Sequence, residues 1–200
     1  MFGASEFQYC VLDPLRIGNK TMVPVRWDKP QSGWTRLNID GSTFGNPGRA
    51  GGGSLIRDDQ GNWVAGFSMN IGFSTSFLAE LWALRDGLTL CKNLNLNAVD
   101  IQIDAKAIVM LFSNPSYSNS FAMPIVDDCR LLFSQIPHVR IGHCYREANS
   151  YADFLARIGS CQNSDLILYN DPPVDLLELL SSDSAGLYCN RLVLVPPLPP

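Results

Sequence analysis

The chain has 200 residues, of which 46% are hydrophobic and 17% are charged, a composition typical of globular rather than disordered proteins. Its net charge of −4 and its pI near 5.0 count against a strong non-specific nucleic-acid binder, which usually carries a clustered basic face. No run approaches the roughly 18 to 20 apolar residues of a membrane span, and the six scattered cysteines lack metal-finger spacing. We therefore expect a soluble protein with free thiols.

Three regions are predicted along the chain. Residues 1–33 are predicted to form a connecting arm, because Pro24 and Pro30 limit regular structure there. Residues 34–160 contain the periodic patterns of one domain. Residues 161–200 include two proline-rich stretches and are predicted to be a C-terminal appendage.

The domain is predicted to begin with three strands. In the first, Trp34–Asp40, the apolar side chains of Leu37 and Ile39 point to one face and polar side chains point to the other. Two more strands are predicted at Ala50–Arg57 and Asn62–Gly72, with a short turn between them. Short connections between sequential strands indicate an antiparallel meander.

The clearest helix is predicted at Ser76–Asn93, where apolar residues recur at helical spacing. Glu80 lies off this apolar stripe and shares its own lane with Ala83 and Gly87. Because these two neighbours are small, we expect this face of the helix to lie close against a backbone.

Strands and helices alternate in the rest of the domain. Strands are predicted at Val99–Asp104 and Val139–His143, and helices at Ala105–Phe112, Met123–Gln135 and Ala148–Ile158, the last with Gly159 as its C-cap. A meander followed by strand–helix alternation predicts an α/β fold with a mixed sheet covered by helices.

Four acidic residues stand among apolar or small neighbours rather than among other charges: Asp40, Glu80, Asp104 and Asp153. Gathered in one cleft, they would repel one another and raise one another's pKa values unless a hard cation neutralised them. Oxygen ligands suit Mg²⁺ or Mn²⁺, whereas Zn²⁺ prefers His or Cys. The four carboxylates therefore predict a divalent-metal site of the phosphodiester-cleaving kind.

Each carboxylate also has a local structural explanation, and these alternatives stay open. Asp40 precedes a glycine and could cap a turn. Glu80 could be a solvated helix residue, and Asp104 could be the N-cap of the helix that follows it. Asp153 could pair with Arg157, four residues later on the same helix.

Four motifs in this order resemble the ribonuclease H family, most of all the reverse-transcriptase-like ribonuclease H domains encoded in plant genomes. They are Asn38-Ile39-Asp40-Gly41-Ser42 with Gly45-Asn46-Pro47-Gly48, Ala79-Glu80-Leu81-Trp82-Ala83-Leu84, Ile101-Gln102-Ile103-Asp104, and the stretch from His143 through Arg146-Glu147-Ala148-Asn149 to Ala152-Asp153-Phe154-Leu155-Ala156. The resemblance covers about Trp27–Gly159. It implies a ribonuclease H-like fold, a five-stranded mixed sheet made of an antiparallel meander and then parallel strands, with helices on both faces.

The resemblance further implies an endonuclease that hydrolyses the RNA strand of RNA–DNA hybrids by two-metal-ion catalysis. The four carboxylates would hold two Mg²⁺ ions, with Mn²⁺ as a substitute. His143, ten positions before Asp153, would assist water activation or product release, although a lone histidine on a core strand is more often structural. Asn46 and Asn149 would be amides that contact the substrate. A retroelement origin is also expected, with action in the nucleus, the favoured compartment, or in an organelle. The protein partner is left open.

A second function class stays open: a non-catalytic binding or interaction module with this fold. Ala105 follows Asp104 where active relatives often carry Ser, and the interval up to Asp153 lacks the basic, Trp-rich protrusion of some bacterial relatives. Affinity for a polyanion is therefore expected to be low, or to come from a partner domain. Retention of four mutually repelling acids argues against this module. A two-carboxylate glycosidase is remote, because no sugar-stacking aromatic platform stands near the acids.

Overall fold

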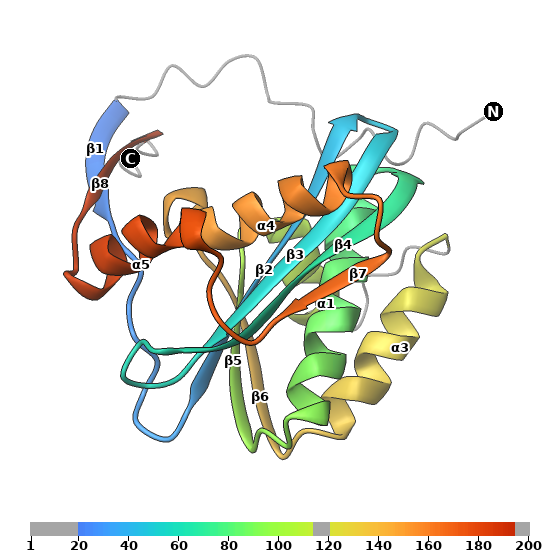
Figure 1. The fold of residues 1–200 in the computed structure, drawn as a ribbon, viewed down its shortest axis with the longest axis horizontal. Coiled ribbons are helices and arrows are strands. Elements are labelled where there is room, and N and C mark those ends of the chain that lie inside the picture. Colours follow the sequence, from blue (N-terminus) through green and yellow to red (C-terminus); the bar gives the residue numbers. More distant parts are fainter. Residues whose placement is uncertain (1–19, 114–120, 195–200) are drawn as a thin grey trace, which may run out of the picture.

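The computed structural model describes residues 20–113 and 121–194, and its centre is a mixed six-stranded sheet (Figure 1). In spatial order the strands are β6 (His138–His143), β5 (Ala98–Ile103), β2 (Thr35–Gly45), β3 (Gly48–Arg57), β4 (Trp63–Ser74) and β7 (Leu166–Tyr169). The meander β2–β3–β4 is antiparallel, while β5 runs parallel to both β2 and β6. The predicted five-stranded mixed sheet is confirmed, and β7 adds a sixth strand antiparallel to β4.

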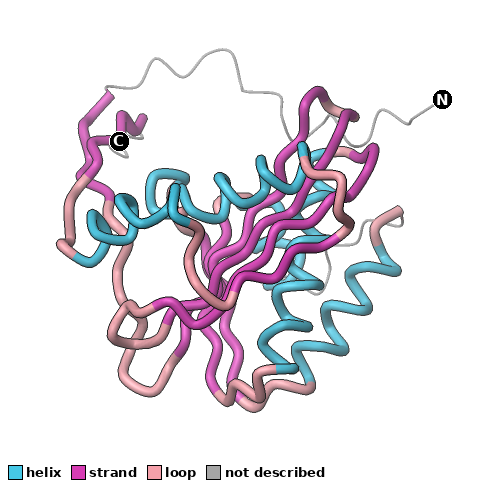
Figure 2. Tube along the Cα trace, viewed as in Figure 1, coloured by secondary structure: helices cyan, strands magenta, loops and turns pink. Residues whose placement is uncertain are grey.

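Helices cover both faces of this sheet, as Figure 2 shows by the cyan coils on either side of the magenta strands. On one face lie α1 (Ser76–Asn93) and α3 (Met123–Ser134), with α2 (Lys106–Ser113) beside them. On the other face lies α4 (Ser150–Cys161). The side chains of β3 alternate between these two cores, since Leu55 packs with α4 and Ile56 packs with α1.

β2, the first of the predicted strands, runs further than its sequence pattern predicts. Asp40 does not end β2, which continues to Gly45 and pairs there with Gly48 across a tight hairpin. Glycines within the predicted strand Ala50–Arg57 are positions at which a helix packs closely. A Cβ on Gly53 would stand 2.2 Å from the Ala156 backbone nitrogen of α4. The glycine-rich strand is therefore a packing surface for helices.

The predicted C-cap of the last helix is wrong. Gly159 lies inside α4, which continues to Cys161. A Cβ on Gly159 would stand 2.3 Å from the carbonyl oxygen of Met69 in β4. This glycine is therefore explained by the close approach of helix and sheet rather than by helix termination.

Parts of the predicted arm and appendage form regular structure together. β1 (Lys20–Val25) and β8 (Cys189–Leu194) make a two-stranded antiparallel sheet. Between α4 and β8 the chain forms β7, a short 3₁₀ turn η3 (Val174–Leu176) and α5 (Leu177–Ser184), and another such turn, η2 (Arg146–Ala148), precedes α4. Residues 1–19 and 195–200 lie outside the described residues, and the division at residues 34 and 160 stays a prediction.

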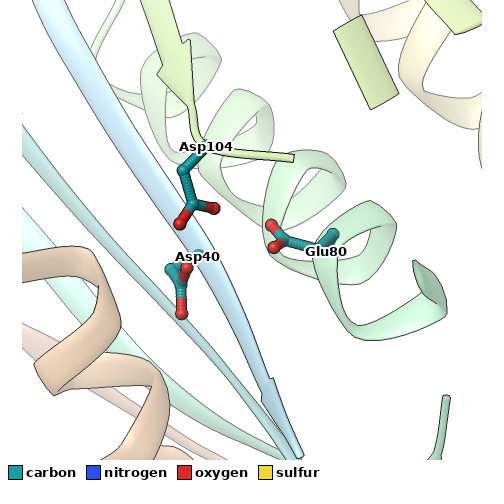
Figure 3. A group of neighbouring side chains, drawn as sticks. All are labelled: Asp40, Glu80 and Asp104. Carbon is teal, nitrogen blue, oxygen red and sulfur yellow. The ribbon is translucent and has the colours of Figure 1, made fainter. Parts of the chain in front are cut away.

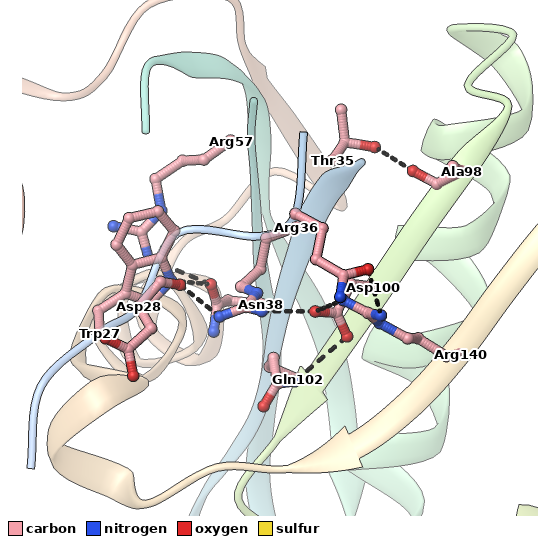
Figure 4. A network of polar contacts seen from close by, with 11 residues as sticks. Trp27, Asp28, Thr35, Arg36, Asn38, Arg57, Ala98, Asp100, Gln102 and Arg140 are labelled. Atoms are coloured by element: carbon pink, nitrogen blue, oxygen red, sulfur yellow. Dashed lines mark hydrogen bonds and ion pairs between the residues drawn. The ribbon is translucent and has the colours of Figure 1, made fainter. Parts of the chain in front are cut away.

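The polar face of β2 is covered by the segment that follows β1 (Figure 4). Asn38 is buried and its side-chain oxygen accepts hydrogen bonds from Trp27 Nε1 and from Arg57, each at 3.1 Å. Arg57 is also buried and pairs with Asp183 of α5 at 2.8 Å. This network ties α5 and the segment after β1 to the sheet beneath them.

Within the described ranges, no helix has both the length and the apolar character needed to cross a membrane. The five cysteines in these ranges are free thiols.

Candidate metal centre

Three of the four predicted carboxylates converge beside the end of β5 (Figure 3). Asp40 lies in β2 and Glu80 lies in α1, while Asp104 is the residue that follows β5. Each offers a carboxylate oxygen, and these oxygens all lie within 4.8 Å of one another. Asp40 and Glu80 are buried, with 4% and 8% of their surfaces exposed.

The backbone explains why these three residues meet. Ile39 and Ile103 are partners in the parallel pair β2–β5, so the residues after them, Asp40 and Asp104, lie side by side. A Cβ on Gly41 would stand 2.3 Å from the Glu80 backbone nitrogen, so α1 crosses β2 directly beside Asp40. The expected close approach of the Glu80 face of the helix to a backbone is confirmed.

Burial and mutual repulsion shift the protonation of all three groups. Burial, followed by the charges of Asp104 and Asp153, raises the pKa of Asp40 to about 8. Burial, followed by the charges of Asp40 and Asp104, raises the pKa of Glu80 well above its ordinary value. The pKa of Asp104 is also raised, chiefly by burial. Glu80 Oε2 is buried without a hydrogen-bond partner. A divalent cation would satisfy this oxygen and relieve the repulsion, so the donor set fits a hard metal ion.

Asp153 stands beside this group rather than within it. It lies in the first turn of α4 and pairs with Arg146 at 2.5 Å and with Arg157 at 3.0 Å. The predicted pairing with Arg157 is therefore present, and the role of Asp153 as a metal ligand stays a prediction. Its charge is nevertheless close enough to raise the pKa of Asp40.

Arg146 is the residue at this centre that the sequence interpretation missed. In the sequence it stands only as part of the fourth motif, with no role assigned to it, yet its charge lowers the pKa of Asp40, of Glu80 and of Asp104. The sequence offered one signal for this role, because Arg146 stands just before the helix that carries Asp153. Its side chain is 61% exposed and is therefore also accessible to a ligand.

His143 lies at the end of β6 and pairs in register with Ile103, next to Asp104. Its ring packs edge to face on Tyr145, with centroids 5.7 Å apart. Burial, with the nearby charge of Lys106, lowers the pKa of His143 below its ordinary value. The imidazole is therefore neutral at pH 7.

The two predicted substrate amides differ in exposure. Asn46 is exposed at the β2–β3 turn, and its side-chain oxygen accepts a hydrogen bond from the Ser76 N–H at the start of α1, at 3.0 Å. Asn149 is 1% exposed, and its amide donates to the Ile39 carbonyl at 2.8 Å and accepts from Asn38 at 3.0 Å. The contacts observed for Asn149 are thus internal, and the substrate contacts of both amides stay predictions.

Comparisons with known proteins agree with this geometry. A family model described as "Reverse transcriptase-like" matches residues 38–159. An Arabidopsis thaliana protein named "Putative ribonuclease H protein" is 34% identical over 163 residues, which are 81% of this chain and 26% of that protein. The chain thus spans about a quarter of that relative's length.

Two solved structures are also similar to this chain. The N-terminal RNase H domain of a Mycobacterium tuberculosis protein is 26% identical with a TM-score of 0.60, covering 64% of this chain and 98% of that chain. LC11-RNase H1, solved in complex with an RNA/DNA hybrid, is 25% identical with a TM-score of 0.58, covering 64% of this chain and 96% of that chain.

Proposed function

This chain belongs to the reverse transcriptase-like ribonuclease H family, and from that premise we propose that it is an endonuclease that hydrolyses the RNA strand of RNA–DNA hybrids. The observation that carries the proposal is the convergence of Asp40, Glu80 and Asp104, with their oxygens within 4.8 Å of one another. Three buried or half-buried carboxylates at this separation are costly without a cation. Access to such hybrids would require the nucleus or an organelle.

These carboxylates would hold divalent ions, Mg²⁺ or Mn²⁺, since all their donor atoms are oxygens. When bound, two such ions supply Lewis acids for the attacking water and for the departing 3′-oxygen. Asp153 would complete the set of ligands once its arginine partners turn away from it.

Arg146 and Arg157 would be the residues that meet the substrate. Their side chains are 61% and 58% exposed, and both now bind the carboxylate of Asp153. A guanidinium binds a phosphate with the same paired hydrogen bonds that it makes to a carboxylate. An arriving phosphodiester would therefore exchange with Asp153 and bring the scissile bond to the carboxylates.

His143 would act as the proton carrier. Because its pKa is lowered, the imidazole is neutral at pH 7 and can accept a proton. Its place beside Asp104 puts it at the rim of the carboxylate group.

A second candidate is a binding module without catalysis. The two arginine pairs of Asp153 favour it, because they already neutralise the fourth carboxylate without a metal ion. In that reading, the arginines hold Asp153 permanently and nucleic acid binds without being cut.

The deciding experiment is cleavage of a labelled RNA–DNA hybrid in Mg²⁺ and in Mn²⁺. Wild-type protein should cut the RNA strand, and Asp104→Asn should not. The matched control is Asp127→Asn, which removes an exposed carboxylate from α3 and should leave cleavage unchanged. Failure of folded wild-type protein to cut in either metal would assign the binding module instead.

A further inference from the structure

The β2–β3 hairpin and the end of β4 project past α4 (Figure 1). They carry two exposed aromatic side chains. Phe44 is 57% exposed and Phe73 is 77% exposed. Arg49 is the ladder partner of both residues, of Phe44 in β2 and of Phe73 in β4. Directly opposed residues in antiparallel strands share a face, so the three side chains form one surface, which we call the aromatic tip. The Arg49 guanidinium lies 6.0 Å from the centre of the Phe44 ring.

The aromatic tip lies on the same side of the sheet as the Asp40 carboxylate. Asp40 and Phe44 are four residues apart on β2, an even spacing that directs both side chains to one face. That face is the α4 side, because Gly53, the ladder partner of Asp40, touches α4. The four residue steps from Asp40 to Phe44 span about 13 Å along the strand. This distance equals the length of roughly four base steps at about 3.4 Å each.

The aromatic tip is also free of negative charge. Neither residues 41–57 nor residues 66–79, which supply the hairpin and most of β4, contain an Asp or a Glu, although the chain carries 19 acidic residues. Arg49 is the charged member of the tip. The residues of the hairpin and of most of β4 therefore add no charge that would repel a polyanion.

We propose that the aromatic tip binds an unpaired nucleic-acid strand that continues from the hybrid, with bases stacked on Phe44 and Phe73 and a phosphate on Arg49. This inference rests on the proposed function, since it assumes that a hybrid lies at the carboxylates. Bases inside a duplex are covered by their neighbours, so exposed rings can stack only on unpaired bases. Aromatic stacking tolerates any base, because every base has a π-face. The substrate class is therefore a hybrid with a single-stranded extension.

Fluorescence anisotropy in EDTA, where no cleavage occurs, tests this inference. The two probes are a blunt RNA–DNA hybrid and the same hybrid extended by an unpaired oligothymidylate tail. Wild-type protein should bind the tailed probe more tightly. Phe73→Ala should weaken binding of the tailed probe by roughly 5- to 150-fold, the loss associated with one base–aromatic stack, and leave the blunt probe unchanged. The matched control is Leu131→Ala, which removes a 59% exposed side chain on α3 and should alter neither.

The outcomes separate this inference from the proposed function. Equal wild-type affinity for the two probes, or an equal loss on both in Phe73→Ala, would overturn the inference. A wild-type dimer that Phe73→Ala dissociates would assign the surface to a second copy of the chain and also overturn it. Cleavage of the blunt hybrid in Mg²⁺ tests the enzyme alone, so cutting without a tail effect refutes only the inference. Tail-dependent binding without cutting supports the aromatic tip and refutes only the catalytic function.

Discussion

Replacing Asp40 by Asn should stabilise the metal-free protein at neutral pH while it removes hybrid cleavage. Burial, and then the charges of Asp104 and Asp153, raises the pKa of Asp40 from 3.8 to about 8. A carboxyl whose folded pKa is raised contributes its stability fully below the unfolded pKa, and that contribution is lost as the pH rises through the folded pKa. The window here runs from about pH 4 to about pH 8.

The size of this effect follows from the same shift. Each pH unit between 3.8 and neutrality costs the folded state about 1.4 kcal/mol, which comes to roughly 4 kcal/mol at pH 7. Asparagine has a similar shape and carries no charge to bury, so Asp40→Asn escapes this cost. For a chain of this size the gain corresponds to a rise in Tm of about 10 °C.

Thermal unfolding followed by circular dichroism in EDTA measures the effect. The difference in Tm between Asp40→Asn and wild type should be near zero at about pH 4 and largest at about pH 8. Added Mg²⁺ should reduce this difference in Tm, because it stabilises the wild type. Asp127→Asn, the exposed control, should show no difference that depends on pH. The reasoning is refuted if Asp40→Asn is less stable than wild type at about pH 8, or if the difference is the same at both pH values.

Four further substitutions test the packing of α4 and the roles of Arg57 and Arg146. Gly53→Ala should cost about 3 kcal/mol in urea unfolding, because its Cβ would stand 2.2 Å from the α4 backbone. Gly142→Ala, which meets only a flexible side chain at 3.3 Å, should cost less than about 1 kcal/mol, and equal costs would contradict the close packing of α4. Asp183→Asn should cost about 3 kcal/mol in the same assay, since it leaves the buried Arg57 without its partner carboxylate; a neutral result would show that this pair adds no stability. Arg146→Met should lower the kcat of hybrid cleavage roughly 100-fold at an almost unchanged Tm, and unchanged kcat would remove Arg146 from the site.

The sequence pattern was most informative where a residue's surroundings are local. The helix at Ser76–Asn93 was predicted with the bounds that α1 has, because its apolar repeat and its polar termini are properties of consecutive residues. The small residues next to Glu80 likewise indicated a close backbone contact, and Gly41 provides it. The sequence was misleading at Gly159, where a helix-ending residue type serves close packing inside α4.

Within residues 34–160, the sequence by itself thus determined the order of strands and helices, the mixed sheet and the candidate carboxylates, since each follows from periodicity and from residues adjacent in the chain. Only the tertiary structure decided that β7 joins the sheet, that β1 pairs with β8, and that Asp40, Glu80 and Asp104 converge while Asp153 stands beside them. The physical reason is distance along the chain. Strands as short as β7, with four residues, are defined by a remote partner, and the charge partners of a carboxylate depend on which backbones the packed glycines bring together.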